Sequence, residues 1–341
     1  MVTIKEIAHA VGVSSATVSR VLNYDMSLSI SGKKRQTIIE TAESLNYATP
    51  RNRNRSSETA SVAPAGGKIA LVHFLRPTEE LTDPYYIGVR LGIENRCQAN
   101  KLEVVKVFHG DDLPDANVLQ SASGVIVVGQ HSDDEIAWLQ RHSRHLVFAD
   151  FCPNSLSIDS VESDFEAAMD RLLTSMFAMG YRRIGFIGRM QTMNGKTEPY
   201  GEKRCRAYIK RMQEAGLFNP EICLVETLTL ENGYELARAM MKTQKPPEAL
   251  IAFNDNMAIG AYRAMQELGL RIPDDVAIVS FNDIPVAQFL NPPLSTIRLP
   301  SEMIGETAVD LLLEQFAGRE LSKRVILSTE QIWRGSSRSP R

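Results

Sequence analysis

A short stretch near the N-terminus combines side chains that can read DNA bases. The spacing of Ser15, Ala16, Ser19 and Arg20 places these four residues on one face of a single helix. A hydroxyl can hydrogen-bond to a base edge, a methyl group can contact the thymine methyl, and a guanidinium can pair with guanine. This pattern predicts contact with the major groove of double-stranded DNA, with Ser15, Ala16 and Arg20 as the base readers.

A second set of polar residues directly follows apolar runs further along the chain. Asp150 ends the run LVFAD, Asn254 follows ALIAF, and Asn282 follows AIVSF. In open sheets of parallel strands, ligands bind beyond the carboxyl ends of the strands. Carboxylates accept hydrogen bonds and carboxamides both donate and accept them, which suits a sugar with neighbouring hydroxyl groups. The plainer alternative is that Asn and Asp simply form turns at strand ends.

The residues around the DNA-reading face predict a scaffold of three helices. Gly12 allows a tight turn between the first two helices, Ser14 or Ser15 can cap the second, and a third begins near Ser31. The residues expected to face inward are Ile4, Ile7, Ala8, Val18, Val21, Leu22, Ile38, Ile39, Ala42 and Leu45. This is a helix-turn-helix pattern, whose second helix lies in the major groove.

From Lys68 onward the sequence alternates between apolar runs and helical patterns. The expected strands are 69–75, 104–108, 125–128, 146–149, 184–187, 250–253 and 276–281. The expected helices are 85–99, 164–179, 200–215, 233–241 and 257–268. Continuous apolar runs suit strands that are buried on both faces, so we expect an α/β body of two doubly wound parallel units.

Composition narrows the class of protein. The first 60 residues hold eight Lys or Arg against five Asp or Glu, although the whole chain has a net charge of −3. This distribution fits a DNA-binding head on an acidic body. The four cysteines show no zinc-ligand spacing, and no apolar run approaches the roughly 18 residues of a membrane span. We therefore expect reduced thiols, a cytoplasmic location and no membrane association.

The sequence lacks the common catalytic motifs. It contains no G-x-S-x-G, no P-loop and no G-x-G-x-x-G. His131, His142 and His145 lie in a charged stretch, which favours a solvated helix face over a metal site. We expect no enzyme activity, no cofactor and no metal.

Several motifs resemble one known family. The run V-G-V-S-x-x-T-V-S-R-V-L-N, followed by I-S-x-x-x-R and L-N-Y, is similar to the headpiece of the LacI/GalR transcriptional regulators. The resemblance extends over the body and implies a periplasmic-binding-protein-like fold of two lobes. It also implies a repressor that acts as a homodimer on a pseudo-palindromic operator, with a small sugar bound between the lobes.

The resemblance assigns residues to the ligand site. In the cleft, Asp150 matches the family's first-lobe aspartate, Arg204 the arginine of R-x-x-[GA]-aromatic, and Asn254 the asparagine of N-D-x-M-A-x-G. Asn282 stands where many relatives have an aspartate, and Tyr86 where they often have an aromatic residue. Asp255 follows Asn254 directly, and we expect it to be a helix N-cap or a contact between the lobes rather than a ligand contact.

From their chemistry alone, Thr17, Ser19 and Asn23 are expected to contact phosphates or a neighbouring base edge. Arg35 is expected to contact a phosphate or to brace the third helix, and Arg51 to contact phosphates or a narrow minor groove.

The expected domain limits follow from these patterns. Residues 1–50 form the headpiece, 51–67 an Arg-rich linker without the family's hinge leucine, 68–335 the body and 336–341 a tail. The first lobe would comprise 68–160 and 291–320, and the second 161–290 and 321–335. The segment 108–124 is short, which predicts a truncated crossover.

The effector is the least determined partner. The motifs D-P-Y-Y, S-x-N-D-I-P and S-E-M-x-G are similar to those of repressors of β-galactosidase operons, which implies a galactoside. Alternatives are a regulator that answers another sugar or a purine, and a sugar-metabolising enzyme with an appended DNA-binding head. A soluble sugar receptor is a further alternative, against which the headpiece argues.

Overall fold

The computed structural model describes residues 4–22, 28, 30–44, 67–76, 80, 83–108, 113–193, 196–198 and 200–338. The chain divides into two compact units, Met1–Val62 and Ala63–Arg341. Each unit has its own hydrophobic core, so each is described by itself.

The described residues of the N-terminal unit form a headpiece of three helices. Its helices are α1 (Ile4–Val11), α2 (Ser15–Leu22) and α3 (Gly32–Ser44). Gly12 has a φ of +68°, as the tight turn requires. Ser14 caps α2, because its Oγ accepts a hydrogen bond from the Thr17 amide at 3.1 Å. The core consists of Ile7, Ala8, Val18, Val21, Ile38 and Ala42, so the predicted helix-turn-helix is confirmed; Leu45 lies outside the described residues.

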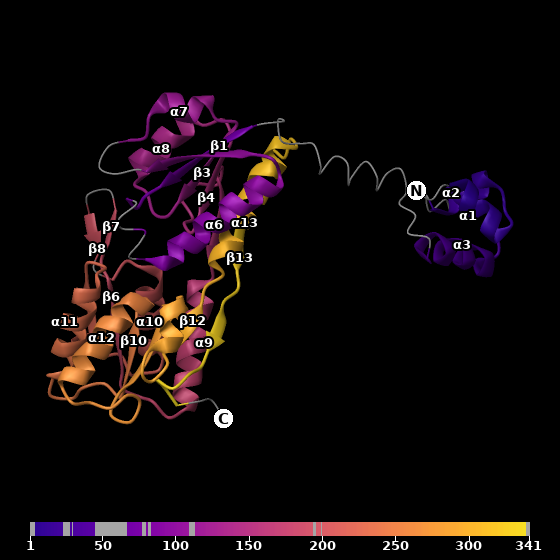
Figure 1. Ribbon diagram of the computed structural model, residues 1–341. Coiled ribbons are helices and arrows are strands. Elements are labelled where there is room, and N and C mark those ends of the chain that lie inside the picture. Colours follow the sequence, from indigo (N-terminus) through magenta and orange to yellow (C-terminus); the bar gives the residue numbers. More distant parts are fainter. Residues whose placement is uncertain are drawn as a thin grey trace. The chain divides into compact units, whose positions relative to one another are not determined.

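The larger unit is an α/β body built on two mostly parallel sheets. Figure 1 labels its helices and strands and colours them by their position in the sequence. Its helices are α6 (Pro84–Ala99), α7 (Ala116–Ser121), α8 (Asp133–His142), α9 (Phe165–Ala178), α10 (Lys203–Glu214), α11 (Leu230–Met241), α12 (Asp255–Glu267) and α13 (Ser301–Phe316). Its main strands are β1 (Lys68–His73), β2 (Glu103–Phe108), β3 (Gly124–Val128), β4 (Leu146–Ala149), β5 (Asp159–Ser163), β6 (Ile184–Arg189), β9 (Cys223–Glu226), β10 (Ala249–Ala252), β11 (Ala277–Asn282), β12 (Ser295–Arg298), β13 (Arg324–Leu327) and β14 (Glu330–Ile332). A small hairpin, β7 (Gln191–Met193) and β8 (Lys196–Glu198), adds to the second lobe.

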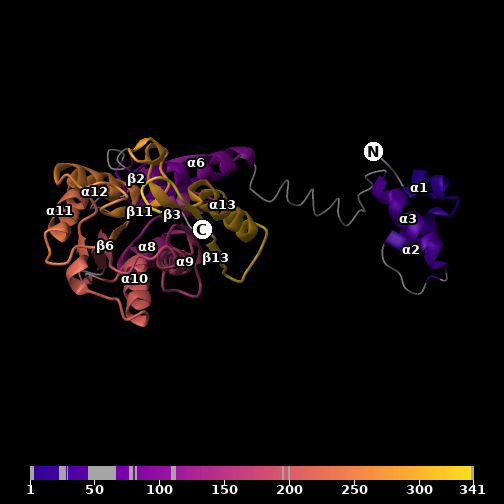
Figure 2. The same cartoon turned by 90° about the horizontal axis from the view of Figure 1, so that it is seen from below.

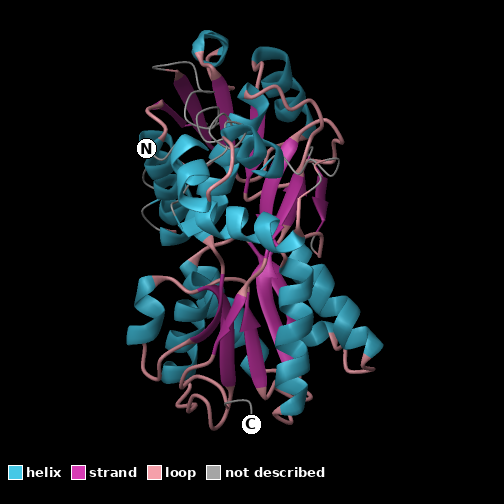
Figure 3. Ribbon diagram, turned by 90° about the vertical axis from the view of Figure 1, so that its right-hand side faces the viewer, coloured by secondary structure: helices cyan, strands magenta, loops and turns pink. Residues whose placement is uncertain are grey.

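Two six-stranded sheets form the centres of the two lobes (Figure 3). The strand order is β13-β5-β4-β3-β1-β2 in the first sheet and β14-β12-β11-β10-β6-β9 in the second. All pairs are parallel except β12 with β14. The carboxyl ends of the parallel strands in each sheet therefore share one edge, as the predicted doubly wound fold requires.

The chain passes between the lobes later than the sequence patterns predicted. Residues 291–320 were expected in the first lobe. Helix α13 of this range does pack there, against α6, but β12 pairs with β11 of the second sheet. Residues 321–335 were expected in the second lobe, but β13 pairs with β5 of the first sheet. Both strands are only four residues long, so their sequences gave little indication of the sheet that they join.

Close helix packing stabilises the first lobe. Helices α6 and α13 lie side by side (Figures 1 and 2). A Cβ atom on Gly92 would lie 2.0 Å from the Glu302 carbonyl oxygen, and one on Gly305 would lie 2.2 Å from that of Val89. Only glycine permits this approach. Helices α8 and α13 were not predicted. In its described residues, the crossover between β2 and β3 carries only the six-residue α7, in line with the truncation expected there.

Within the described part of the chain, no helix is both long and apolar enough to cross a membrane.

Candidate functional site

A cavity of about 680 Å³ lies between the lobes, at the carboxyl ends of both sheets. Aromatic side chains form much of its wall, and polar groups project into it from both lobes. Its main lining residues are Phe74, Tyr85, Tyr86, Gln130, Asp150, Phe151, Glu162, Phe165, Arg189, Glu202, Lys203, Arg204, Phe253, Asn254 and Asn282. An aromatic wall with a few polar groups is typical of sites for small organic molecules.

The five residues predicted for the ligand site all line this one cavity. Tyr86 and Asp150 come from the first lobe, and Arg204, Asn254 and Asn282 come from the second. They are separated by up to 196 positions in the sequence, since the set runs from Tyr86 to Asn282. Their contact with a ligand stays a prediction.

The first-lobe wall is built around Asp150. This residue follows β4 with a φ of +59°, and its Oδ1 accepts a hydrogen bond of 2.6 Å from the Tyr85 hydroxyl. Burial raises the pKa of Asp150 to about 6, although the Tyr85 hydrogen bond and the charge of Arg204 oppose this shift. Asp150 is therefore a pre-oriented acceptor whose charge depends on pH near neutrality.

Tyr86 belongs to an aromatic cluster on the same wall. Its ring meets Phe74 edge-on at 4.9 Å and Tyr85 at 5.0 Å between centroids. Asp83 caps α6, because its carboxylate accepts a hydrogen bond from the Tyr85 amide at 3.3 Å. This cap fixes the start of the helix that carries both tyrosines. The cap and the packing hold the two rings beside Asp150.

The second-lobe wall is built around Arg204, which lies near the start of α10. Its guanidinium stacks on the Phe253 ring, with Cζ 3.5 Å from the centroid, and Nη1 donates to the Phe253 carbonyl at 3.0 Å. Glu202 caps the helix and also accepts from Arg204 Nε at 3.0 Å. The arginine is thus held flat, with one face against an aromatic ring.

The two asparagines occupy strand ends in the second lobe. Asn254 caps α12, since its Oδ1 accepts from the Met257 amide at 3.0 Å, which leaves its NH₂ group for a ligand. Asn282 ends β11 with a φ of +111°, a conformation that few side chains other than Asn or Asp tolerate. The turn-forming and ligand-facing interpretations are therefore compatible at both positions.

Asp255 has neither of the roles expected for it. Asn254 is the cap, and Asp255 is buried inside the second lobe. Its Oδ1 accepts from the hydroxyls of Ser280 and of Thr296, the latter at 2.8 Å, and its Oδ2 accepts from the Ile284 amide at 2.7 Å. The prediction was wrong because a strand-end aspartate can also join neighbouring strands, which its local sequence does not reveal.

Two polar contacts join the lobes across the cavity. Lys203 of α10 pairs with Glu162 of β5, and Arg189 of β6 donates to the Gln130 side chain beyond β3. All four residues line the cavity. These contacts hold the lobes together in this conformation.

Three important residues of the cleft were not predicted: Tyr85, Glu202 and Phe253. Each is close in sequence to a residue that was. Tyr85 precedes Tyr86, Glu202 stands two positions before Arg204, and Phe253 precedes Asn254. A search of the positions next to each predicted residue would have included them, but their contacts with Asp150 and Arg204 depend on the fold.

The DNA-reading face of α2 is open to solvent. Ser15, Ala16 and Arg20 are exposed, Thr17 and Ser19 are half-buried, and Val18 and Val21 are buried on the opposite side. Arg35 of α3 donates to the Leu28 carbonyl at 3.3 Å, which supports a bracing role. Asn23 and Arg51 lie outside the described residues.

No cluster of metal-binding side chains occurs among the described residues. His131 is buried against the Phe148 ring, so the expectation of a solvated face was wrong for this residue. All four cysteines are free thiols.

Comparisons with known proteins agree with this architecture. The model of bacterial regulatory proteins of the lacI family matches residues 3–50, and that of periplasmic binding protein-like domains matches residues 173–337. The HTH-type transcriptional repressor MelR of Bacillus subtilis (strain 168) is 36% identical over 342 residues, covering 98% of this chain and 97% of MelR. The lactose operon repressor of Rhizobium radiobacter is 60% identical over 110 residues, which are 32% of this chain and 97% of that protein.

A solved structure shares the fold over nearly the whole length. The complex of the transcriptional regulator CelR with cellobiose has a TM-score of 0.71 and 22% identity, and it covers 98% of this chain and 100% of CelR.

Proposed function

Because the chain belongs to the LacI family of bacterial regulatory proteins, we propose that it is a cytoplasmic repressor of a sugar-catabolic operon. It binds an operator through α2, and a sugar bound between the lobes changes its affinity for that operator. The proposal rests on one observation: the same chain has an exposed base-reading face on α2 and a polar, aromatic cavity in the body.

DNA recognition is assigned to the exposed side of α2. Arg20 offers paired donors for guanine, Ser15 a hydroxyl for a base edge, and Ala16 a methyl group for thymine. Thr17 and Ser19, together with Asn23, Arg35 and Arg51, are proposed to contact phosphates or neighbouring base edges. Because Val18 and Val21 anchor the other side of the helix, the reading face is presented on a rigid support.

The protein is proposed to act as a homodimer. Two headpieces are needed to occupy two half-sites about one helical turn apart on a pseudo-palindromic operator. Dimerisation is assigned to the body, because the two headpieces must reach separate half-sites.

The proposed effector is a small sugar, and a galactoside in particular. Asp150, Arg204, Asn254 and Asn282 supply hydrogen-bonding groups of both polarities, and the rings of Tyr86 and Phe74 supply apolar surface for a sugar face. The similarity to a lactose operon repressor favours a galactoside. The same cavity leaves another sugar or a purine as alternatives within the family.

Coupling between the sites is proposed to arise from lobe closure. The ligand would contact both walls, so it favours the arrangement in which the walls are close. The coupling free energy equals the difference in ligand affinity between the two arrangements. The contacts Lys203–Glu162 and Arg189–Gln130 span the lobes and contribute to the same balance.

We further propose that the chain is not an enzyme. The relatives are named as transcriptional regulators, and Asp150 is engaged by a tyrosine rather than by a nucleophile or a second acid. Turnover of the bound sugar, detected by product analysis after prolonged incubation, would instead favour a sugar-metabolising enzyme with an appended DNA-binding head.

The DNA half of the proposal is tested with Arg20→Ala. An operator selected by the protein from a pool of random duplexes is the probe. The substitution should weaken specific binding by about 1–3 kcal/mol and relax the base preference at one position of each half-site. An equal loss on random DNA would contradict a base-reading role for Arg20.

A further inference from the structure

The first sheet has a second edge, opposite to the edge that faces the cavity. All of its strands are parallel, so their first residues lie along one edge, which we name the amino edge. Ile69 of β1 is level with Gly124 of β3, and Val125 is level with Leu146 of β4. Lys68 and Arg144 therefore lie on this edge two strand spacings apart, which is roughly 10 Å. β1 is also the strand through which the chain enters the body from the N-terminal unit.

Basic side chains collect along the amino edge. Helices that cover a parallel sheet run against the strands, so α6, α8 and α13 also end here. The basic residues of the edge are Lys68, Lys101, Arg141, Arg144, Arg319, Lys323 and Arg324, and the acidic ones are Glu103, Asp159, Glu314 and Glu320. The edge is thus basic, although the whole chain has a net charge of −3.

Ion pairing engages three of the four acidic residues, all but Glu320, and it leaves more basic than acidic residues unpaired in the described part of the chain. Arg319 holds Asp159, Lys323 holds Glu314 at 2.6 Å, and Lys68 is 3.9 Å from Glu103. Among the basic residues, Lys101, Arg141 and Arg144 form no ion pair in the part of the chain that the structure describes. No carboxylate oxygen of these described residues lies within 4.0 Å of their side-chain nitrogens.

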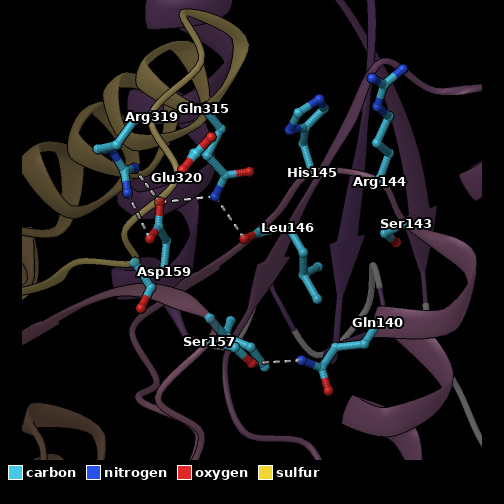
Figure 4. A pocket seen from close by; sticks show the side chains of 12 residues that line it. Gln140, Ser143, Arg144, His145, Leu146, Ser157, Asp159, Gln315, Arg319 and Glu320 are labelled. Carbon is cyan, nitrogen blue, oxygen red and sulfur yellow. Dashed lines mark hydrogen bonds and ion pairs between the residues drawn. The ribbon is translucent and has the colours of Figure 1, made fainter.

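Arg144 and Arg141 are both available to a partner. Both side chains are exposed. Figure 4 shows the Arg144 side chain pointing away from the Arg319–Asp159 pair, and it lines a polar pocket together with Gln140, Ser143, His145 and Glu320. Arg141 Nε donates a hydrogen bond of 3.3 Å to the Ala137 carbonyl, which leaves the rest of its guanidinium for a partner.

Helix ends explain only part of this pattern. The carbonyl end of a helix favours a nearby cation, which accounts for Arg141 in the last turn of α8 and for Lys101 just after α6. Arg144 takes the same position after α8 that Lys101 takes after α6, so helix ends favour all three cations. They do not explain why none of the three has an acidic partner in the described part of the chain.

We propose that the amino edge binds phosphates of the DNA duplex outside the half-site read by α2, with Arg141 and Arg144 as the main contacts. This inference rests on the proposed function. Phosphate contacts need exposed cations rather than a shaped pocket. The amino edge carries such exposed cations. The first strand after the DNA-reading unit, β1, also begins at this edge.

The experiment compares two duplexes that carry the same selected operator. One ends at the operator, and the other extends it by about ten base pairs of unrelated sequence on each side. Binding of the full chain is titrated over a range of salt concentrations. The test variant is Arg141→Ala/Arg144→Ala. The control variant is Lys242→Ala/Lys245→Ala, which removes the same charge from exposed positions of the second lobe.

The wild type should bind the extended duplex more tightly and with a steeper salt dependence. The test variant should lose at least tenfold in affinity on the extended duplex at low salt, and its log–log salt slope should fall by about 0.9 for each lost phosphate contact. Binding to the short duplex should not change. The control variant should behave as the wild type on both duplexes.

Two results would overturn the inference: unchanged binding of the extended duplex by the test variant, or an equal loss on both duplexes. The second result would mean that the arginines act through the overall charge. Failure of the wild type to select any operator would instead refute the proposed function, so the two failures are distinguishable. Unchanged galactoside binding by the variant verifies that its body is folded.

Discussion

Two aspartates follow strands in the two lobes, and burial raises the pKa of each to about 6, yet their surroundings differ. Asp150 lines the cavity and takes its hydrogen bonds from tyrosines of one helix. Asp255 lies inside the second lobe, where donors from β11, β12 and the Ile284 amide occupy both of its oxygens. A raised pKa therefore does not identify a binding residue. The distinguishing feature is whether the carboxylate faces a space that a ligand can enter.

The largest expected effect is on stability, from Asp255→Ala. The substitution leaves the Ser280 and Thr296 hydroxyls and the Ile284 amide without their acceptor, and each unsatisfied buried group costs about 1–3 kcal/mol. We expect a loss of about 3 kcal/mol or more in the free energy of unfolding, measured by urea denaturation. A loss below about 1 kcal/mol would show that Asp255 does not hold these strands together.

The pH dependence of stability should separate Asp255→Asn from the wild type. The folded pKa of Asp255 lies above its ordinary value, so the folded state takes up a proton before the unfolded state does as the pH falls. Between pH 7 and pH 4 the wild type should therefore gain stability relative to Asp255→Asn, which has no proton to bind. Parallel stability curves for the two proteins would argue against the raised pKa.

Asp150→Asn should affect the ligand rather than the fold. A hydrogen bond to a charged group contributes about 1.5–3 kcal/mol, so we expect galactoside affinity to fall about tenfold to a hundredfold by calorimetry. The free energy of unfolding should change by less than about 1 kcal/mol, because the side chain still accepts from Tyr85. If stability fell and affinity did not, Asp150 would resemble Asp255 in its role.

Tyr85→Phe tests how Asp150 is prepared for the ligand. The hydroxyl favours the charged carboxylate, so its removal should raise the pKa of Asp150 above about 6. Affinity should fall several-fold at pH 7, from a loss of about 0.5–1.5 kcal/mol, and the pH at which binding is half lost should rise. Tyr208→Phe is the matched control, since it removes a buried hydroxyl that donates to the Ile184 carbonyl at 2.7 Å. An identical pH profile in the wild type and Tyr85→Phe would refute the link.

The smallest effect is expected for Lys203→Met. This change removes the pair with Glu162, in which the lysine is 37% exposed, so water screens much of the interaction. We expect a decrease of less than about fivefold in galactoside affinity, because one contact that favours closed lobes is lost. Glu162→Gln should produce a similar decrease, and the double variant should add little to it. Additive losses would indicate that the two side chains act independently.

The sequence predicted the elements that depend on local patterns. The headpiece helices followed from apolar spacing, Gly12 and Ser14, and fully buried strands such as β4 and β6 followed from continuous apolar runs. The short strands β5, β12 and β13 were missed or assigned to the wrong lobe, because their polar residues are satisfied only by partners distant in sequence.

For the ligand site, the sequence predicted residues that line the cavity but not the contacts that support them. Strand ends and motif positions led to Asp150, Arg204, Asn254 and Asn282, which the fold gathers around one cavity. The supporting contacts were not predictable, because the Tyr85–Asp150 bond joins residues 65 positions apart and the Arg204–Phe253 contact joins residues 49 apart. Such pairs depend on how the strands are ordered in the sheets.

The most direct test of the account measures operator affinity with and without a sugar in the cleft. The full chain would be titrated onto its selected operator at fixed salt, alone and with saturating galactosides, together with Asp150→Asn. We predict that one galactoside changes the affinity of the wild type, and that Asp150→Asn needs about tenfold to a hundredfold more of it for the same change. Operator binding that stays the same with every galactoside, purine and other sugar tested would contradict the proposed coupling between the cleft and the DNA-reading helix.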